Sequence, residues 1–193
     1  MIRLVIGAAV LWLSSALAVL AHDGQDHASP GESAVFPPEH LLAPNIPVVD
    51  RAGRSAGFVD RYGASGAVVI SFTYASCTTV CPVANAILSE VQAELGDVTL
   101  LTVSVDPARD TPEAMRQSAE AFAAGANWEW VAASVADTPQ LLAAFGVPAG
   151  PLEAHDPMFL IGDVGQGTFV RILGLPQPEQ LVEIVRDATG SCR

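Results

Sequence analysis

Apolar runs alternate with segments of helical pattern between residues 67 and 132, and this alternation limits the chain to few folds. The runs at 67–74 and 98–105 are rich in β-branched residues and almost uncharged, which predicts strands buried on both faces. Residues 82–95, and the segment that Thr111 opens as an N-cap, carry helical patterns. Strands that alternate with helices predict an α/β fold with a parallel core and helices on both faces.

Two hairpins are predicted to flank this core. The first runs from Val48 to Val59 around a glycine-containing turn, and the second turns at residues 165–167. The order of hairpin, core, hairpin and last helix predicts a thioredoxin-like fold. It has a central mixed sheet with helices on both faces and an N-terminal β-hairpin. The other expected elements are a strand at 128–132, helices at 138–145 and 178–188, and strands at 158–161 and 168–173.

Residues 1–21 are typical of an export signal, with Arg3 before an apolar stretch and small residues up to Ala21. The stretch is slightly shorter than the roughly 20 residues of a bilayer span. We therefore expect cleavage, with an uncleaved membrane anchor as the alternative. Either way the rest is expected outside the cytoplasm, in the periplasm, where disulfides persist. Residues 22–47 predict a flexible tether, and residues 48–190 predict one domain.

The charge balance excludes one class of partner. The chain carries 21 acidic and nine basic residues, none of them lysine, for a formal charge of −12. Such a chain has no surface to neutralise phosphates, so nucleic acid is not an expected partner. The acidity is explained by solubility, with attraction of a cationic partner or of metal ions as the alternative.

The strongest local motif is a cysteine pair, Cys77 and Cys81, directly after the first core strand and before Pro82. If Cys77 begins the helical turn, the i, i+4 spacing places both sulfurs on one helix face. The positive N-terminal end of a helix stabilises thiolates. Such a pair can form a disulfide or bind a soft metal, with a purely structural disulfide as the alternative. Cys192 is interpreted as a spare thiol, with intermolecular pairing as the alternative.

His155 is the only histidine within residues 48–190, and it lies in a loop before a predicted strand. In a thioredoxin plan this loop passes the start of the dithiol helix. Two thiolates and an imidazole suit copper as Cu(I) and Cu(II), although zinc accepts the same atoms. In the tether, His22 and His27 are candidates for an accessory Cu(II) site.

Two motifs resemble the Sco/SenC family: CxxxCP within residues 71–82 and DPxxDTPE within residues 104–113. The resemblance implies a thioredoxin-like copper carrier that helps to load the binuclear copper centre of cytochrome c oxidase or a similar cuproenzyme. It also implies that Cys77, Cys81 and His155 are the copper ligands. Asp106 and Asp110 match an acidic motif near the site and could orient His155 or form a docking surface. Flanking the helix that starts at Thr111 is the alternative role for these carboxylates.

Three functions compete for this site. The first is a copper metallochaperone. The second is a thiol–disulfide oxidoreductase that uses Cys77 and Cys81 as a redox pair and needs a thiol reductant. A peroxidase, with Thr73 beside a reactive cysteine, has little local support. The sequence therefore leaves open whether the protein is an enzyme, and membrane contact is expected only through an uncleaved N-terminal segment.

Overall fold

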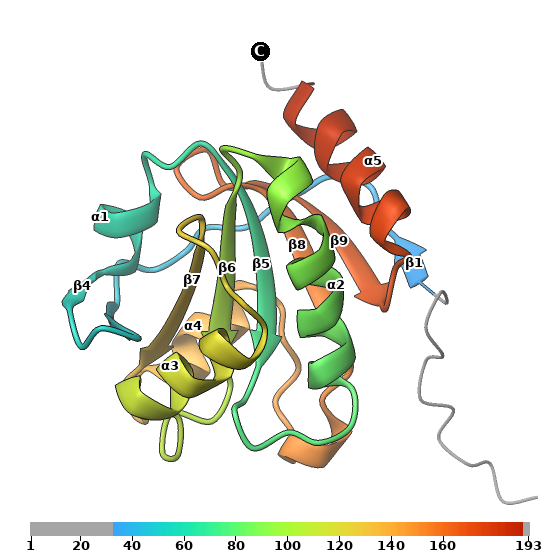
Figure 1. Ribbon diagram of the computed structural model, residues 1–193. Coiled ribbons are helices and arrows are strands. Elements are labelled where there is room, and N and C mark those ends of the chain that lie inside the picture. The colour runs from blue at the N-terminus through green and yellow to red at the C-terminus, as the bar shows by residue number, and fades with distance from the viewer. Residues whose placement is uncertain (1–32, 191–193) are drawn as a thin grey trace, which may run out of the picture.

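The computed structural model describes residues 33–190, which form a nine-stranded sheet with helices on both faces (Figure 1). Residues 1–21, with the expected signal, lie outside the described residues, as do His22, His27 and Cys192. Among the helices within 33–190, none has the length and apolar character required to cross a membrane.

The centre of the sheet is parallel, as the alternating pattern predicts. β5 (Ala67–Thr73), β6 (Thr99–Ser104) and β7 (Trp128–Ala133) run side by side in the same direction. Helix α2 (Cys81–Leu95) connects β5 to β6, and α3 (Pro112–Ala121) connects β6 to β7. The prediction of a parallel core is confirmed.

Antiparallel strands complete the sheet on both sides of this core. β8 (Met158–Asp163) pairs with β5, and β9 (Thr168–Gly174) follows it through the expected hairpin. On the other side, β3 (Pro47–Asp50) pairs with β7 and with β4 (Ser55–Gly57). The first hairpin is therefore shorter than expected.

The segment expected to continue that hairpin is helical instead. α1 (Phe58–Tyr62) begins directly after β4, and the prediction of a strand at Phe58 is wrong. Phe58 and Tyr62 are both buried, with ring centroids 5.1 Å apart. One helical turn places residues four apart on the same face, so both rings reach the core.

The sheet also extends into the predicted tether. β1 (Ser33–Val35) and β2 (Glu39–His40) both pair antiparallel with β9. The structure thus differs from the expectation of a flexible segment over residues 33–47. The sequence pattern missed these strands because they are only three and two residues long, too short to show a period.

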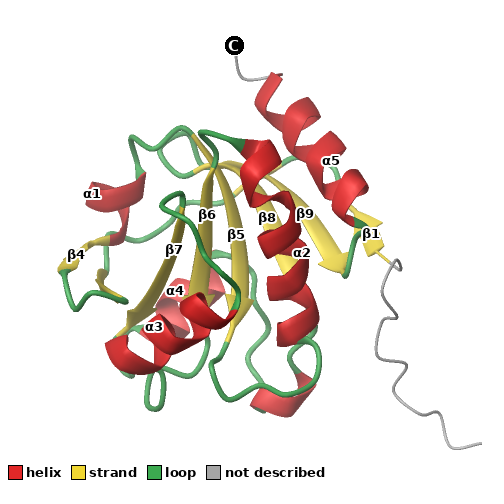
Figure 2. Ribbon diagram, viewed as in Figure 1, coloured by secondary structure: helices red, strands yellow, loops and turns green. Residues whose placement is uncertain are grey.

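Helices cover the two faces of the sheet unequally (Figure 2). α2, α3 and α5 (Pro178–Gly190) pack on one face around Trp128, and α1 and α4 (Thr138–Ala144) pack on the other around Phe145. Each face has its own hydrophobic core, as expected for a three-layer α/β fold. A short 3₁₀ helix, η1 (Leu152–Ala154), interrupts the loop before β8.

Candidate metal centre

The predicted site residues come from loops that meet at one edge of the sheet. β5 and β6 are parallel, so the loops that follow them leave from the same edge. β8 runs antiparallel to β5, so the loop that precedes β8 arrives at that edge too. In Figure 1 these loops lie together at the lower end of the molecule. Carboxyl-end edges of this kind are the usual ligand-binding positions of open α/β sheets.

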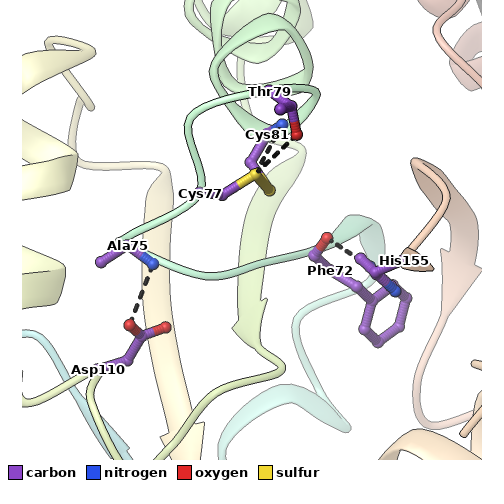
Figure 3. The surroundings of a disulfide bond; sticks show 7 residues. All are labelled: Phe72, Ala75, Cys77, Thr79, Cys81, Asp110 and His155. Carbon is purple, nitrogen blue, oxygen red and sulfur yellow. Dashed lines mark hydrogen bonds between the residues drawn. A yellow bond between two sulfur atoms is a disulfide. The ribbon is translucent and has the colours of Figure 1, made fainter. Parts of the chain in front are cut away.

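The cysteine pair forms a disulfide in this structure, with the two Cα atoms 5.8 Å apart (Figure 3). Helix α2 begins at Cys81, so Cys77 lies in the loop before it and does not begin the helix. The backbone N–H of Cys77 donates to the Tyr74 carbonyl at 3.1 Å. This turn leads into the dithiol, and residues 77–80 between it and α2 are not helical.

The start of α2 favours negative charge on Cys77. The backbone N–H of Cys81 points at the Cys77 Sγ, 3.4 Å away. It is one of the N–H groups at the helix start that have no partner within the helix, and the helix dipole adds partial positive charge there. When the disulfide is reduced, this environment stabilises a Cys77 thiolate, the form that binds metals and attacks disulfides.

His155 lies in the loop before β8, the strand that pairs with β5, and its Nε2 is 3.0 Å from the carbonyl oxygen of Phe72. A carbonyl only accepts hydrogen bonds, so Nε2 carries the proton. Burial lowers the pKa of His155 below 6.5, although the Phe72 carbonyl and Asp156 act in the opposite direction. The imidazole is therefore neutral at neutral pH, and its Nδ1 has the lone pair that a metal requires.

The three predicted ligands share the edge but do not form a closed cage in this oxidised structure. Within residues 33–190, no three His, Cys, Asp or Glu side chains are gathered closely enough to hold a metal ion. The sulfur atoms are bonded to each other, and the imidazole is turned toward Phe72 (Figure 3).

Asp110 contacts the dithiol loop. Its buried carboxylate accepts the backbone N–H of Ala75 at 3.0 Å and the Ser104 hydroxyl at 2.5 Å. Burial raises the pKa of Asp110, and these two hydrogen bonds limit the rise. Asp110 therefore attaches the segment before Cys77 to the end of β6.

Asp106 has a different set of contacts. Its carboxylate pairs with Arg109, and its backbone N–H donates to the Ser104 Oγ at 3.0 Å. None of these bonds of Asp106 or Asp110 reaches His155. Thr111 caps α3 by accepting the Ala114 N–H at 3.2 Å, as its place in the motif predicts.

Sequence reasoning missed Ser104, whose hydroxyl donates to the Asp110 carboxylate and accepts the backbone N–H of Asp106, and it missed the carbonyl of Phe72. The position of Ser104 at a strand end, two residues before Asp106, is a weak signal for the first. A backbone carbonyl leaves no signal in the sequence at all.

The fold and this edge define a thioredoxin-like protein with a dithiol at the start of its first long helix. The chain belongs to the SCO1/SenC family, since the model of that family matches residues 48–173. No curated protein matches the chain.

Solved structures share the fold at low sequence identity. A SCO1/SenC family lipoprotein from Bacillus anthracis is 21% identical, with a TM-score of 0.66 over 80% of this chain and 99% of that one. Bradyrhizobium japonicum ScoI with copper bound is 24% identical, with a TM-score of 0.62 over 76% of this chain and 99% of that one. Yeast Sco1 with copper bound is 19% identical, with a TM-score of 0.61 over 79% and 90%.

Proposed function

We propose that this protein is an exported copper metallochaperone that binds copper through Cys77, Cys81 and His155 and passes it to a cuproenzyme. The observation that carries the proposal is that the loops with the dithiol and with a neutral imidazole lie at the same edge of the sheet. Membership of the SCO1/SenC family and copper-bound structures from that family support the choice of copper. A relative is described as a member of the Sco family of cytochrome c oxidase assembly proteins. The binuclear copper centre of that oxidase is therefore the proposed destination.

Copper is the cargo in this proposal, and reduction must precede loading. A thiol reductant supplies two electrons and two protons to open the Cys77–Cys81 disulfide. The two thiols lose their protons when they bind Cu(I), and thiolate sulfur favours that oxidation state. His155 adds nitrogen, which also accommodates Cu(II). Its ring must leave the Phe72 carbonyl or bind through the free Nδ1. Transfer then proceeds by exchange of these ligands for those of the acceptor.

The location of the protein is part of the proposal. An export signal at residues 1–21 would place the domain in the periplasm. The relative from Bacillus anthracis is described as a lipoprotein. If cleavage follows Ala21, His22 becomes the new N-terminus, and its amine and imidazole with His27 offer an accessory Cu(II) site. Asp110 would support the dithiol loop from the β6 side through the Ala75 backbone, and Ser104 links Asp106 to Asp110.

Anaerobic titration of the reduced protein with Cu(I) tests the proposal. We expect one copper per chain in the wild type, and loss of this end point in Cys77→Ser and Cys81→Ser. Cys192→Ser is the matched cysteine control and should keep the end point.

The His155→Ala variant should lose the charge-transfer absorption of the Cu(II) form. His40 is an exposed histidine of β2, and the control variant His40→Ala should keep this absorption. Equal copper retention in wild type and Cys77→Ser would contradict the proposal.

The closed disulfide favours a second function, reduction of cysteines in a target protein. A Cys77 thiolate would attack a target disulfide to give a mixed disulfide and one target thiolate. Cys81 would then attack Cys77, release the second target thiolate and restore the Cys77–Cys81 bond. Rapid turnover of protein disulfides by copper-free protein, with negligible copper binding, would favour this function over the first.

A further inference from the structure

A large groove, which we call the apolar groove, opens at the same edge of the sheet as the metal centre. Its volume is about 1180 Å³. Small-molecule pockets measure roughly 300–1,000 Å³, so the groove suits a longer ligand. Its walls come from the loops after β6 and β7, from α4, from the loop before β8 and from the ends of β1 and β9.

The apolar groove reaches the candidate metal centre at His155, whereas Cys77 and Cys81 are not among its lining residues. His155 is one of its lining residues, and Asp156 and Met158 line it next to the histidine. Asp106, from the acidic motif, lines it on the β6 side. A chain segment bound in the groove would therefore lie against the imidazole.

Some apolar side chains that line this groove are exposed to water. Val135 is 64% exposed and Leu173 is 38% exposed, and both line the groove. Leu142, which is half-buried, and Val147, which is buried, also line the groove. Contiguous exposed apolar surface in a folded protein is typical of an interaction site.

Charge decides which occupant fits. Among the side chains that the structure describes, the charged ones that line the groove are Asp106, which pairs with Arg109, and Asp156. A second copy of the chain carries the same charge of −12 and would be repelled. Residues 22–32 of the chain carry three carboxylates and neither lysine nor arginine, so their charge does not complement the acidic groove either.

We propose that the apolar groove binds an extended apolar segment of the copper-receiving protein, flanked by lysine or arginine. This inference rests on the proposed function and adds to it the surface that selects the acceptor. Apolar side chains of the segment would cover Val135 and Leu173, and its cations would face Asp156. The acceptor's metal ligands would thereby be held next to His155 during ligand exchange.

Fluorescence anisotropy with a defined probe tests the groove. The probe is a fluorescein-labelled ten-residue peptide in which leucine alternates with lysine, and its counterpart carries glutamate in place of lysine. Saturable binding of the lysine peptide to the wild-type protein is expected, with binding of the glutamate peptide at least tenfold weaker. Val135→Arg and Leu173→Arg should each lower the affinity for the lysine peptide about tenfold or more, as expected for central contacts of an interface.

A matched variant separates the groove from general charge attraction. Leu42 is 70% exposed and is not among the groove's lining residues, so Leu42→Arg adds the same charge elsewhere. It should change the affinity less than twofold. Equal weakening by Leu42→Arg and Val135→Arg would mean that the acidic surface alone attracts the peptide, and the proposal would be overturned. Absence of saturable binding to the wild type would overturn it as well.

Copper titration of the same variants distinguishes this inference from the proposed function. Val135→Arg should still bind one Cu(I) per chain while it loses the peptide, which supports a docking role. A protein that binds copper but shows no groove-dependent peptide binding refutes the inference and leaves the proposed function intact. A wild-type protein that takes up no copper refutes the proposed function, and with it the acceptor that this inference names.

Discussion

Replacement of Asp110 by alanine should destabilise the fold by way of the dithiol loop. The substitution removes the acceptor of a buried hydrogen bond from the Ser104 hydroxyl at 2.5 Å and of a partly buried one from the Ala75 N–H at 3.0 Å. Each buried donor left without a partner costs about 1–3 kcal/mol. Removal of a buried carboxyl, whose ionised form is unfavourable there, offsets part of this loss. We expect the free energy of unfolding to fall by about 2–4 kcal/mol.

Asp110→Asn is the informative companion variant. Asparagine keeps an acceptor oxygen, and its amide can donate to the Ser104 Oγ, so the expected loss is about 1 kcal/mol. Denaturant unfolding of the oxidised proteins measures both values. Asp97→Ala, at an exposed position, is the control and should lie within about 0.5 kcal/mol of wild type. Unfolding free energies of both Asp110 variants within this margin would refute the assigned role of the carboxylate.

The pH dependence gives a second check on Asp110. Burial raises its pKa in the folded protein above the ordinary value of 3.8, so the folded state binds this proton more readily than the unfolded state. The resulting stabilisation is complete below pH 3.8 and is lost as the pH rises through the folded pKa. The stability advantage of wild type over Asp110→Asn should therefore shrink as the pH increases from 3.8. An advantage that grows over this range would contradict the raised pKa.

Three further predictions concern other parts of the chain. Because burial lowers the pKa of His155, NMR titration of its ring in the oxidised protein should give a midpoint below 6.5, and a higher midpoint would contradict its assigned environment. Arg61→Gln leaves the buried Asp50 carboxylate with one guanidinium partner fewer, and should lower the free energy of unfolding in urea by roughly 3 kcal/mol. Met115→Ala creates a cavity beneath α3 and should lower the free energy of unfolding by about 2–5 kcal/mol, without a change in copper stoichiometry.

The disulfide links the two candidate functions to one chemical state. With Cys77 and Cys81 oxidised, neither sulfur can bind Cu(I), so copper loading depends on the reductant that opens the bond. Asp110 holds the backbone at Ala75, two residues before Cys77. Stability of that loop should therefore influence both copper affinity and the ease of reduction.

The sequence by itself determined the elements whose signals are local. The apolar runs predicted β5 and β6, the Thr111–Pro112 pair predicted the start of α3, and CxxxCP predicted the dithiol beside a helix start. Each of these signals is an apolar run, a helix cap or a short motif. All of its residues are neighbours in the sequence, so no distant partner is needed to recognise it.

Only the tertiary structure decided the features that depend on distant residues. β1 and β2 exist because β9 supplies their hydrogen-bond partners, more than 120 positions later in the chain. The Phe72 carbonyl holds His155, and Asp110 holds Ala75, through the order of the strands in the sheet. Short strands and single side chains have no period of their own, so their positions follow from which strand ends the fold brings to one edge.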